Sequence, residues 1–185
     1  MLHGTGGNES SLVSLGQALD PDASIISPRG QSLEEGVPRF FRRLSEGVFD
    51  LEDVERRAHE LADWLEAFCA GNGLAPPYAV GFSNGANMGV HVRLARPEAL
   101  AGVVAIRAQR VWRPEPLPSL DRKPVLILSG EQDPIVSRAE AEALAAILRE
   151  AGAEVDHRWM PAGHNLTRGD IDAAREWLSL RAKNA

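Results

Sequence analysis

The sequence predicts an α/β fold in which a mostly parallel β-sheet is flanked by helices. Residues 78–82, 100–106 and 124–130 form short segments that are apolar on both faces, as strands buried in a parallel sheet are. Amphipathic stretches with helical spacing separate them, and this alternation is typical of an α/β protein. A chain of 185 residues is expected to form a single domain that spans residues 1–185.

The remaining elements follow from the same patterns. Two more strands are expected at residues 23–27 and 154–160. Helices are expected at 51–70, from residue 84 to near Pro97, at 137–153 and at 170–184. The third of these helices has a suitable N-cap in Ser137 and a stop signal in Gly152. The proline-rich segment 110–124 lies between two predicted strands and is interpreted as a loop.

Composition excludes several classes of protein. The chain has 20 basic and 26 acidic residues and a net charge of −6, whereas nucleic-acid binding requires a basic face. Cys69 is the single cysteine, so an intrachain disulfide and a cysteine-based zinc cluster are both excluded, and it is interpreted as an apolar filler. The longest apolar runs are too short to span a bilayer. No nucleic-acid partner, no membrane span and a cytoplasmic location are therefore expected.

A Gly-x-Ser-x-Gly pattern, GFSNG at residues 81–85, lies where the strand 78–82 gives way to a helix. The pattern is typical of a nucleophile elbow, a strained turn that exposes the hydroxyl of Ser83 to substrate. Glycine is expected at positions 81 and 85 because larger side chains there would collide across the turn. A five-residue pattern also recurs by chance, and the alternative is a serine that only caps the helix.

A nucleophilic serine needs a histidine as base and a carboxylate that orients it. Asp133 follows the strand 124–130, and His164 lies on a loop after the strand 154–160. Both loops leave the carboxyl edge of the parallel sheet, where Ser83 also lies. Glu131 is a less favoured alternative acid. The other polar candidates are interpreted as surface or packing residues, since they fall inside predicted helices or strands: His59, His91, Asp156 and His157.

An oxyanion hole would complete this site with backbone N–H donors. One donor is expected from Asn84, the residue after the serine, and the other from Thr5 in the glycine-rich segment LHGTGGNE at residues 2–9. This segment lacks the Gly-x-Gly-x-x-Gly pattern of a dinucleotide site. Without the other site residues, it would be interpreted as a plain flexible loop.

Taken together, LHGTGGNE, GFSNGAN, GEQDPIV and GHNLT resemble the phospholipase/carboxylesterase family of the α/β-hydrolases. The segments SPRG and FFRRLSEGVFD are similar to its hydroquinone-pathway or dienelactone-type carboxylesterases. The resemblance covers nearly the whole chain. It implies an α/β-hydrolase fold, a Ser83–Asp133–His164 triad, Thr5 and Asn84 as oxyanion donors, no cofactor, no metal, and small soluble esters or thioesters as substrates.

The chain departs from the family at its N-terminus. In the family an apolar strand precedes the His-Gly loop, but only Met1 and Leu2 precede His3 here. The sheet is therefore expected to lack its first strands, with the domain truncated relative to the family and the start interpreted as a misplaced methionine. Each buried backbone group left unpaired would cost about 1–3 kcal/mol. The alternative is a genuine terminus with a sheet that closes in another way.

The function predicted from these residues is a serine carboxylesterase that hydrolyses small soluble carboxylic esters through an acyl-enzyme on Ser83. The alternatives are a thioesterase or lysophospholipase with the same triad, a non-catalytic binding protein on a hydrolase fold, and a fragment that does not fold. The expected partner is a small-molecule ester. The sequence leaves the oligomeric state open, a homodimer included.

Residues near the expected site have two interpretations each. Phe40, Phe41 and Trp112 either line an acyl pocket or belong to the core. Arg107, at the end of the strand 100–106, either contacts a polar leaving group or forms a structural salt bridge, and the salt bridge is favoured.

Overall fold

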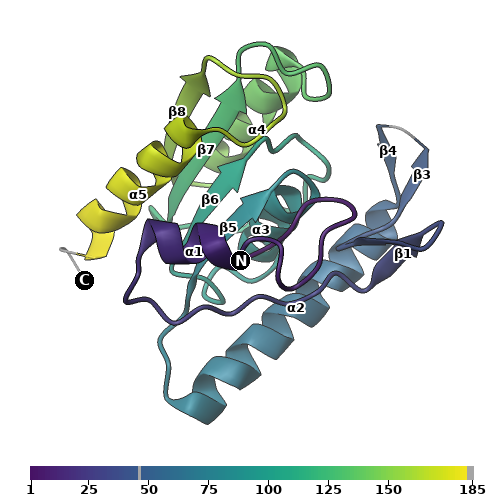
Figure 1. Ribbon diagram of the computed structural model, residues 1–185. Helices are drawn as coiled ribbons and strands as arrows, with labels where there is room; N and C mark the ends of the chain where they lie inside the picture. The colour runs from purple at the N-terminus through teal and green to yellow at the C-terminus, as the bar shows by residue number, and fades with distance from the viewer. Residues whose placement is uncertain (46, 183–185) are drawn as a thin grey trace.

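The structure is a computed structural model that describes residues 1–45 and 47–182. At its centre lies a four-stranded sheet in the order β5-β6-β7-β8, and every neighbouring pair of strands is parallel (Figure 1). The strands are Tyr78–Phe82 (β5), Gly102–Ile106 (β6), Pro124–Gly130 (β7) and Glu154–Met160 (β8). The predicted α/β class with a parallel sheet is confirmed.

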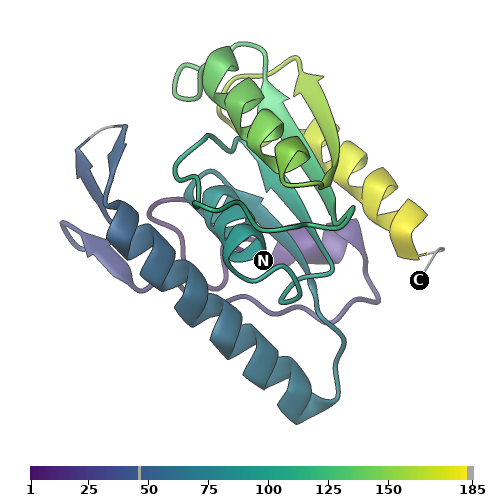
Figure 2. The ribbon, with the colours of Figure 1, turned by 180° about the vertical axis from the view of Figure 1, so that it is seen from behind.

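Helices cover both faces of this sheet, which explains why its inner strands are apolar on both sides. On one face lie α2 (Leu51–Asn72), α3 (Asn84–Ala95) and α4 (Arg138–Glu150), as Figure 2 shows. On the other face lie α1 (Val13–Leu19) and α5 (Arg168–Ala182) (Figure 1). A separate hydrophobic cluster lies on each face of the sheet, and successive residues of β6 alternate between them. Val103 belongs to the cluster beneath α2, α3 and α4, and Val104 belongs to the cluster beneath α1 and α5.

The predicted helices are present, and their ends follow local chemistry. Ser137 caps α4 by accepting a hydrogen bond from the N–H of Glu140 at 3.2 Å. Asp50 caps α2 in the same way, and α2 ends at Gly73, whose φ of +65° suits glycine. The predicted residues 183 and 184 of the last helix lie outside the described residues. Cys69 is buried on α2.

The predicted strand at residues 23–27 is wrong, because this segment is irregular. Its apolar side chains pack as a loop: the Cδ1 atom of Ile25 lies against Gly16 of α1, and Ile26 packs against the core. Two short hairpins in the next segment were not predicted. They consist of β1 (Ser32–Glu34) with β2 (Val37–Arg39), and β3 (Arg43–Ser45) with β4 (Val48–Phe49).

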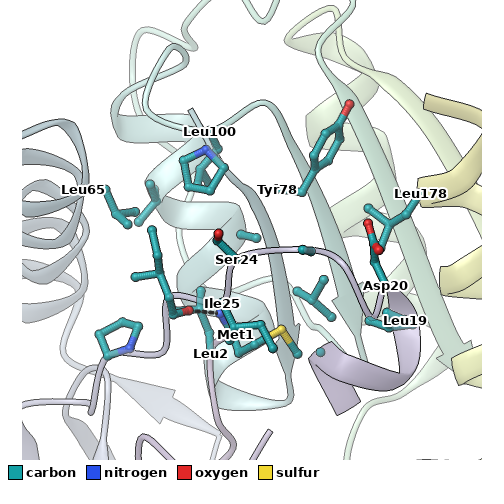
Figure 3. Close-up of a pocket in the computed structure, with 18 of the residues that line it drawn as sticks. Met1, Leu2, Leu19, Asp20, Ser24, Ile25, Leu65, Tyr78, Leu100 and Leu178 are labelled. Atoms are coloured by element: carbon teal, nitrogen blue, oxygen red, sulfur yellow. Dashed lines mark hydrogen bonds between the residues drawn. The ribbon is translucent and has the colours of Figure 1, made fainter. Parts of the chain in front are cut away.

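Strand β5 forms the edge of the described sheet, apart from a single parallel bridge to Leu2. The N–H of Leu2 donates to the carbonyl of Val80 at 2.9 Å, and the N–H of Phe82 donates to the carbonyl of Leu2 at 3.1 Å. Beside this bridge lies an apolar cavity of about 250 Å³, which includes Leu65, Tyr78 and Leu100 among its lining residues (Figure 3). The expected absence of strands on this side of β5 agrees with the described sheet.

Helix α3 is buried from Asn84 to Leu94, and it carries His91 into the core. The imidazole is 0% exposed and contacts the rings of Phe41 and Trp112 edge-on. Neither of its ring nitrogens has a hydrogen-bond partner within the described part of the chain. Burial therefore lowers the pKa of His91 to about 3, and the ring is neutral in the folded protein at neutral pH.

We expect His91 to make the protein acid-sensitive. Below the ordinary histidine pKa of 6.5 the unfolded chain binds a proton that the folded chain refuses. Stability should therefore fall by about 1.4 kcal/mol for each pH unit between roughly 6.5 and the folded value. Urea unfolding of the parent and of His91→Leu between about pH 7 and pH 4.5 measures this. For each pH unit of acidification, the free energy of unfolding of His91→Leu should fall by about 1.4 kcal/mol less than that of the parent. An equal pH dependence in the two proteins would contradict the role given to His91.

Candidate active site

The turn between β5 and α3 holds Ser83 in a strained backbone conformation, with φ at +52°. Positive φ is uncommon outside glycine, and such strain gathers at functional sites. The N–H of Ser83 donates to the carbonyl of Ile106 at 2.8 Å, which ties the turn to the end of β6. Among the described residues, the Ser83 side chain makes no capping hydrogen bond to α3. A helix-capping role for this serine is therefore not observed.

Both glycines of the motif are required by close backbone contacts. A Cβ atom on Gly81 would lie 2.5 Å from the carbonyl oxygen of Gly85. A Cβ atom on Gly85 would lie 2.1 Å from the carbonyl oxygen of Leu2 and 2.4 Å from that of His3. The N-terminal loop thus rests directly against the serine turn, which brings Thr5 toward the site.

The structure brings Ser83, His164 and Asp133 together. The Nε2 atom of His164 lies 2.9 Å from the Oγ atom of Ser83. The Nδ1 atom of the same ring lies 2.9 and 3.1 Å from the two carboxylate oxygens of Asp133. The His164 side chain is 16% exposed and that of Asp133 is 1% exposed, so solvent reaches the ring but hardly reaches the carboxylate.

The carboxylate of Asp133 is held in place by its own loop. Its Oδ1 atom accepts the N–H groups of Ile135 at 2.8 Å and Val136 at 3.0 Å. Glu131, the alternative acid, is exposed on this loop, whereas Asp133 is the residue that contacts the His164 ring. Asp133, and not Glu131, is therefore the acid that lies within hydrogen-bond distance of the His164 ring.

The other polar candidates lie elsewhere in the fold. Asp156 and His157 lie within β8, and the His157 Nε2 atom is 2.9 Å from the Oγ atom of Ser129. Burial lowers the pKa of this half-buried histidine. His59 lies on α2, and His91 lies in the core.

The two expected oxyanion donors are backbone N–H groups in the N-terminal loop and at the start of α3. Those of Thr5 and Asn84 donate no hydrogen bond to any residue that the structure describes. The Arg39 Nη1 atom donates to the Oγ1 atom of Thr5 at 2.9 Å, and the N–H of Phe40 donates to Oδ1 of Asn84 at 2.7 Å. The last residue of β2 and the residue after it therefore hold both residues that carry the expected donors. The sequence did not reveal this role of Arg39, because the hairpin was not predicted.

The loop that carries Thr5 is fixed by the ring of His3. The N–H of Gly30 donates to Nε2 of His3 at 3.0 Å, so Nδ1 carries the ring proton and donates to the carbonyl of Gly4 at 2.7 Å. Burial lowers the pKa of His3 and favours this neutral form. The histidine of the His-Gly motif thus shapes the loop.

The three aromatic residues expected near an acyl pocket lie in or against the core. Phe40 and Phe41 are 5% and 0% exposed and belong to the main hydrophobic cluster, and Trp112 packs against that cluster. This placement favours a core role for them. Arg107 forms a fully buried ion pair with Asp170, as the favoured interpretation expected.

The described residues contain no group of three or more histidine, cysteine or acidic side chains that could hold a metal ion. Within the same residues, no helix is long and apolar enough to cross a membrane.

Residues 78–182 match the family described as Phospholipase/Carboxylesterase. The chain belongs to this family. It is 41% identical over 179 residues to the putative hydrolase MhqD of Bacillus subtilis (strain 168), covering 96% of this chain and 90% of that protein. The fold is that of the α/β-hydrolases, as the resemblance implied.

Solved structures of carboxylesterases agree with this membership. The Bacillus cereus carboxylesterase is 41% identical with a TM-score of 0.92, over 97% of this chain and 85% of that one. A carboxylesterase from Mesorhizobium loti is 28% identical with a TM-score of 0.89, over 96% and 86% of the two chains.

We expect Gly85→Ala to destabilise the protein by about 3 kcal/mol or more, because its Cβ atom would collide with backbone that has no room to move. Gly71→Ala is the matched control. It lies in α2 with nothing within 4 Å of its Cβ position, and it should be neutral or stabilising by up to about 1 kcal/mol. Urea unfolding measures both variants, and equal stabilities would contradict the contact.

Proposed function

We propose that this chain is a serine carboxylesterase that hydrolyses small soluble carboxylic esters through an acyl-enzyme on Ser83. One observation supports it above the others: Ser83, His164 and Asp133 form a continuous hydrogen-bonded series at the carboxyl edge of the sheet. A binding protein has no need of all three groups in this order. The membership in a carboxylesterase family points the same way.

Acylation uses each of the three side chains in turn. The Oγ atom of Ser83 attacks the acyl carbonyl carbon while Nε2 of His164 removes the hydroxyl proton. The carbonyl π electrons move to its oxygen, which becomes an oxyanion. Asp133 accepts the Nδ1–H hydrogen bond and stabilises the imidazolium. Collapse of the intermediate breaks the bond to the alcohol oxygen, which takes the proton from His164.

Deacylation repeats these steps with water as the nucleophile. His164 removes a proton from water, the resulting hydroxide attacks the acyl-enzyme, and collapse returns the proton to Ser83 as the carboxylic acid leaves. In both halves, the N–H groups of Thr5 and Asn84 are the proposed oxyanion donors. Their lack of a partner within the described chain supports this role, since such donors must be available before charge develops.

We expect Ser83→Ala to abolish activity, with kcat/KM for p-nitrophenyl acetate and butyrate falling by roughly 10⁴-fold or more. The variant should also lose labelling by a fluorophosphonate probe. Ser179→Ala is the matched control, because this serine is exposed and, among the described residues, its hydroxyl donates only to the carbonyl of Arg175 in its own helix. Equal rates for the parent and Ser83→Ala would exclude the proposal.

We expect Asp133→Asn to lower kcat by roughly 10³–10⁴-fold, because the amide no longer stabilises the imidazolium and favours the wrong tautomer. Glu131→Gln, on the same loop but exposed, should retain parent kinetics. Steady-state kinetics on the p-nitrophenyl esters separates the two acids. The reverse pattern would make Glu131 the orienting acid.

A further inference from the structure

We propose that Arg107 and Asp170 are positioning residues, which hold the loop carrying His164 so that its ring faces Ser83. This inference rests on the proposed function, and it gives a role in catalysis to an ion pair that contacts none of the reacting atoms. Its basis is that the guanidinium binds the main chain on both sides of His164.

The first contacts are made to the histidine loop itself. The Nε atom of Arg107 donates to the carbonyl of Gly163 at 2.7 Å, and its Nη2 atom donates to the carbonyl of Asn165 at 3.2 Å. These are the residues immediately before and after His164. The carbonyl of Gly163 belongs to the peptide that precedes His164, and that of Asn165 belongs to the peptide after Asn165, so one rigid, planar group holds the main chain on either side of His164.

The second contacts are made to Asp170, in the first turn of α5. Nη1 and Nη2 of Arg107 donate to its two carboxylate oxygens at 2.8 and 2.9 Å, and both side chains are 0% exposed. The Asp170 Oδ2 atom also accepts the N–H of Thr167 at 2.8 Å and its hydroxyl at 2.7 Å. The carboxylate thus joins the far end of the histidine loop to the same guanidinium.

The third set of contacts anchors Arg107 in the sheet. Its N–H and its Nη1 atom both donate to the carbonyl of Leu128 in β7, at 2.9 and 3.0 Å. Its backbone has φ at +58°, in the left-handed region. The five N–H bonds of the guanidinium match five acceptor atoms, which belong to Gly163, Asn165, Leu128 and the two oxygens of Asp170.

The histidine loop is also confined by the segment that carries Asp133. A Cβ atom on Gly130 would lie 2.5 Å from the carbonyl oxygen of Gly163, and the N–H of Gln132 donates to the carbonyl of Ala162 at 3.1 Å. The loop is therefore held between the Asp133 loop and the guanidinium. Weakening the guanidinium side should let the imidazole drift from the serine, and a displacement of about 1 Å can cost roughly 100-fold in rate.

Arg107→Lys and Asp170→Asn test this role. An ammonium has three donors instead of five and cannot span both carbonyls, whereas Asp170→Asn keeps the shape but loses the charge. We expect kcat on p-nitrophenyl acetate to fall roughly 10- to 100-fold with KM changed less than about 2-fold. The enzyme concentration used to calculate kcat is the concentration of active sites, which is measured by labelling the protein to completion with a fluorophosphonate. The rate constant of this labelling should fall together with kcat.

Arg93→Lys is the matched control. Arg93 is also 0% exposed, but it lies on α3 and donates to the carbonyl of Pro97, a residue outside the site. This variant should keep the parent kcat for each labelled site, even where it lowers the melting temperature. If Arg107 had only a structural role, Arg107→Lys would behave like this control. It would have fewer active sites, and each would keep the kcat and the labelling rate of the parent.

The results for these variants distinguish a failure of the inference from a failure of the proposed function. If Arg107→Lys and Asp170→Asn keep the kcat of the parent for each labelled site, the inference is overturned. The proposed function would still stand in that case, provided that Ser83→Ala has lost its activity. Failure of both variants to fold would also overturn the inference, because the pair would then serve the whole fold. If Ser83→Ala matched the parent, the proposed function itself would have failed.

Discussion

The strained turn at Ser83 is the constraint on which the rest of the site depends. A chain that leaves β5 and enters α3 within one residue needs bare backbone at Gly81 and Gly85. The space that Gly85 leaves open is filled by the main chain of Leu2 and His3, so the glycine positions the N-terminal loop as well as the helix. The proposed nucleophile Ser83 and the loop that carries the proposed oxyanion donor Thr5 are thus parts of one packing arrangement.

Parallel strands then supply the other site residues from a distance along the chain. β5, β7 and β8 end at the same edge of the sheet, and Ser83, Asp133 and His164 come from the segments that follow them (Figure 1). The sheet places these segments near one another, but side-chain contacts between loops bring the three groups within hydrogen-bond distance. The geometry of these three side chains therefore depends on loop–loop contacts as much as on the fold.

Two sets of buried polar groups among the described residues differ in how they are satisfied. Arg107 and Asp170 satisfy each other and the surrounding carbonyls, and this makes them specific as well as costly to disturb. His91 has no partner for either ring nitrogen among the described residues, and burial keeps it neutral. The first set holds a loop in one conformation, whereas the second makes the core sensitive to acid.

Local sequence patterns were enough to predict the helices and strands that depend mainly on their own residues. Both-face apolarity located β5, β6 and β7, helical periodicity located α2, α4 and α5, and the Gly-x-Ser-x-Gly turn located Ser83. Chain order and strand ends were enough to select Asp133 and His164. The strands and helices could be predicted because each depends on a few neighbouring residues, whereas the choice of Asp133 and His164 stays a prediction that rests on the common direction of parallel strands.

Only the tertiary structure decided the remaining features, because they depend on partners far away in sequence. The segment 23–27 has the composition of a strand but no strand beside it, and it packs as a loop. For Phe40 and Phe41 the sequence left a pocket role and a core role open, since the core that covers them comes from other elements. Arg107 reads in sequence as a charge at a strand end, and its partner Asp170 lies 63 residues away.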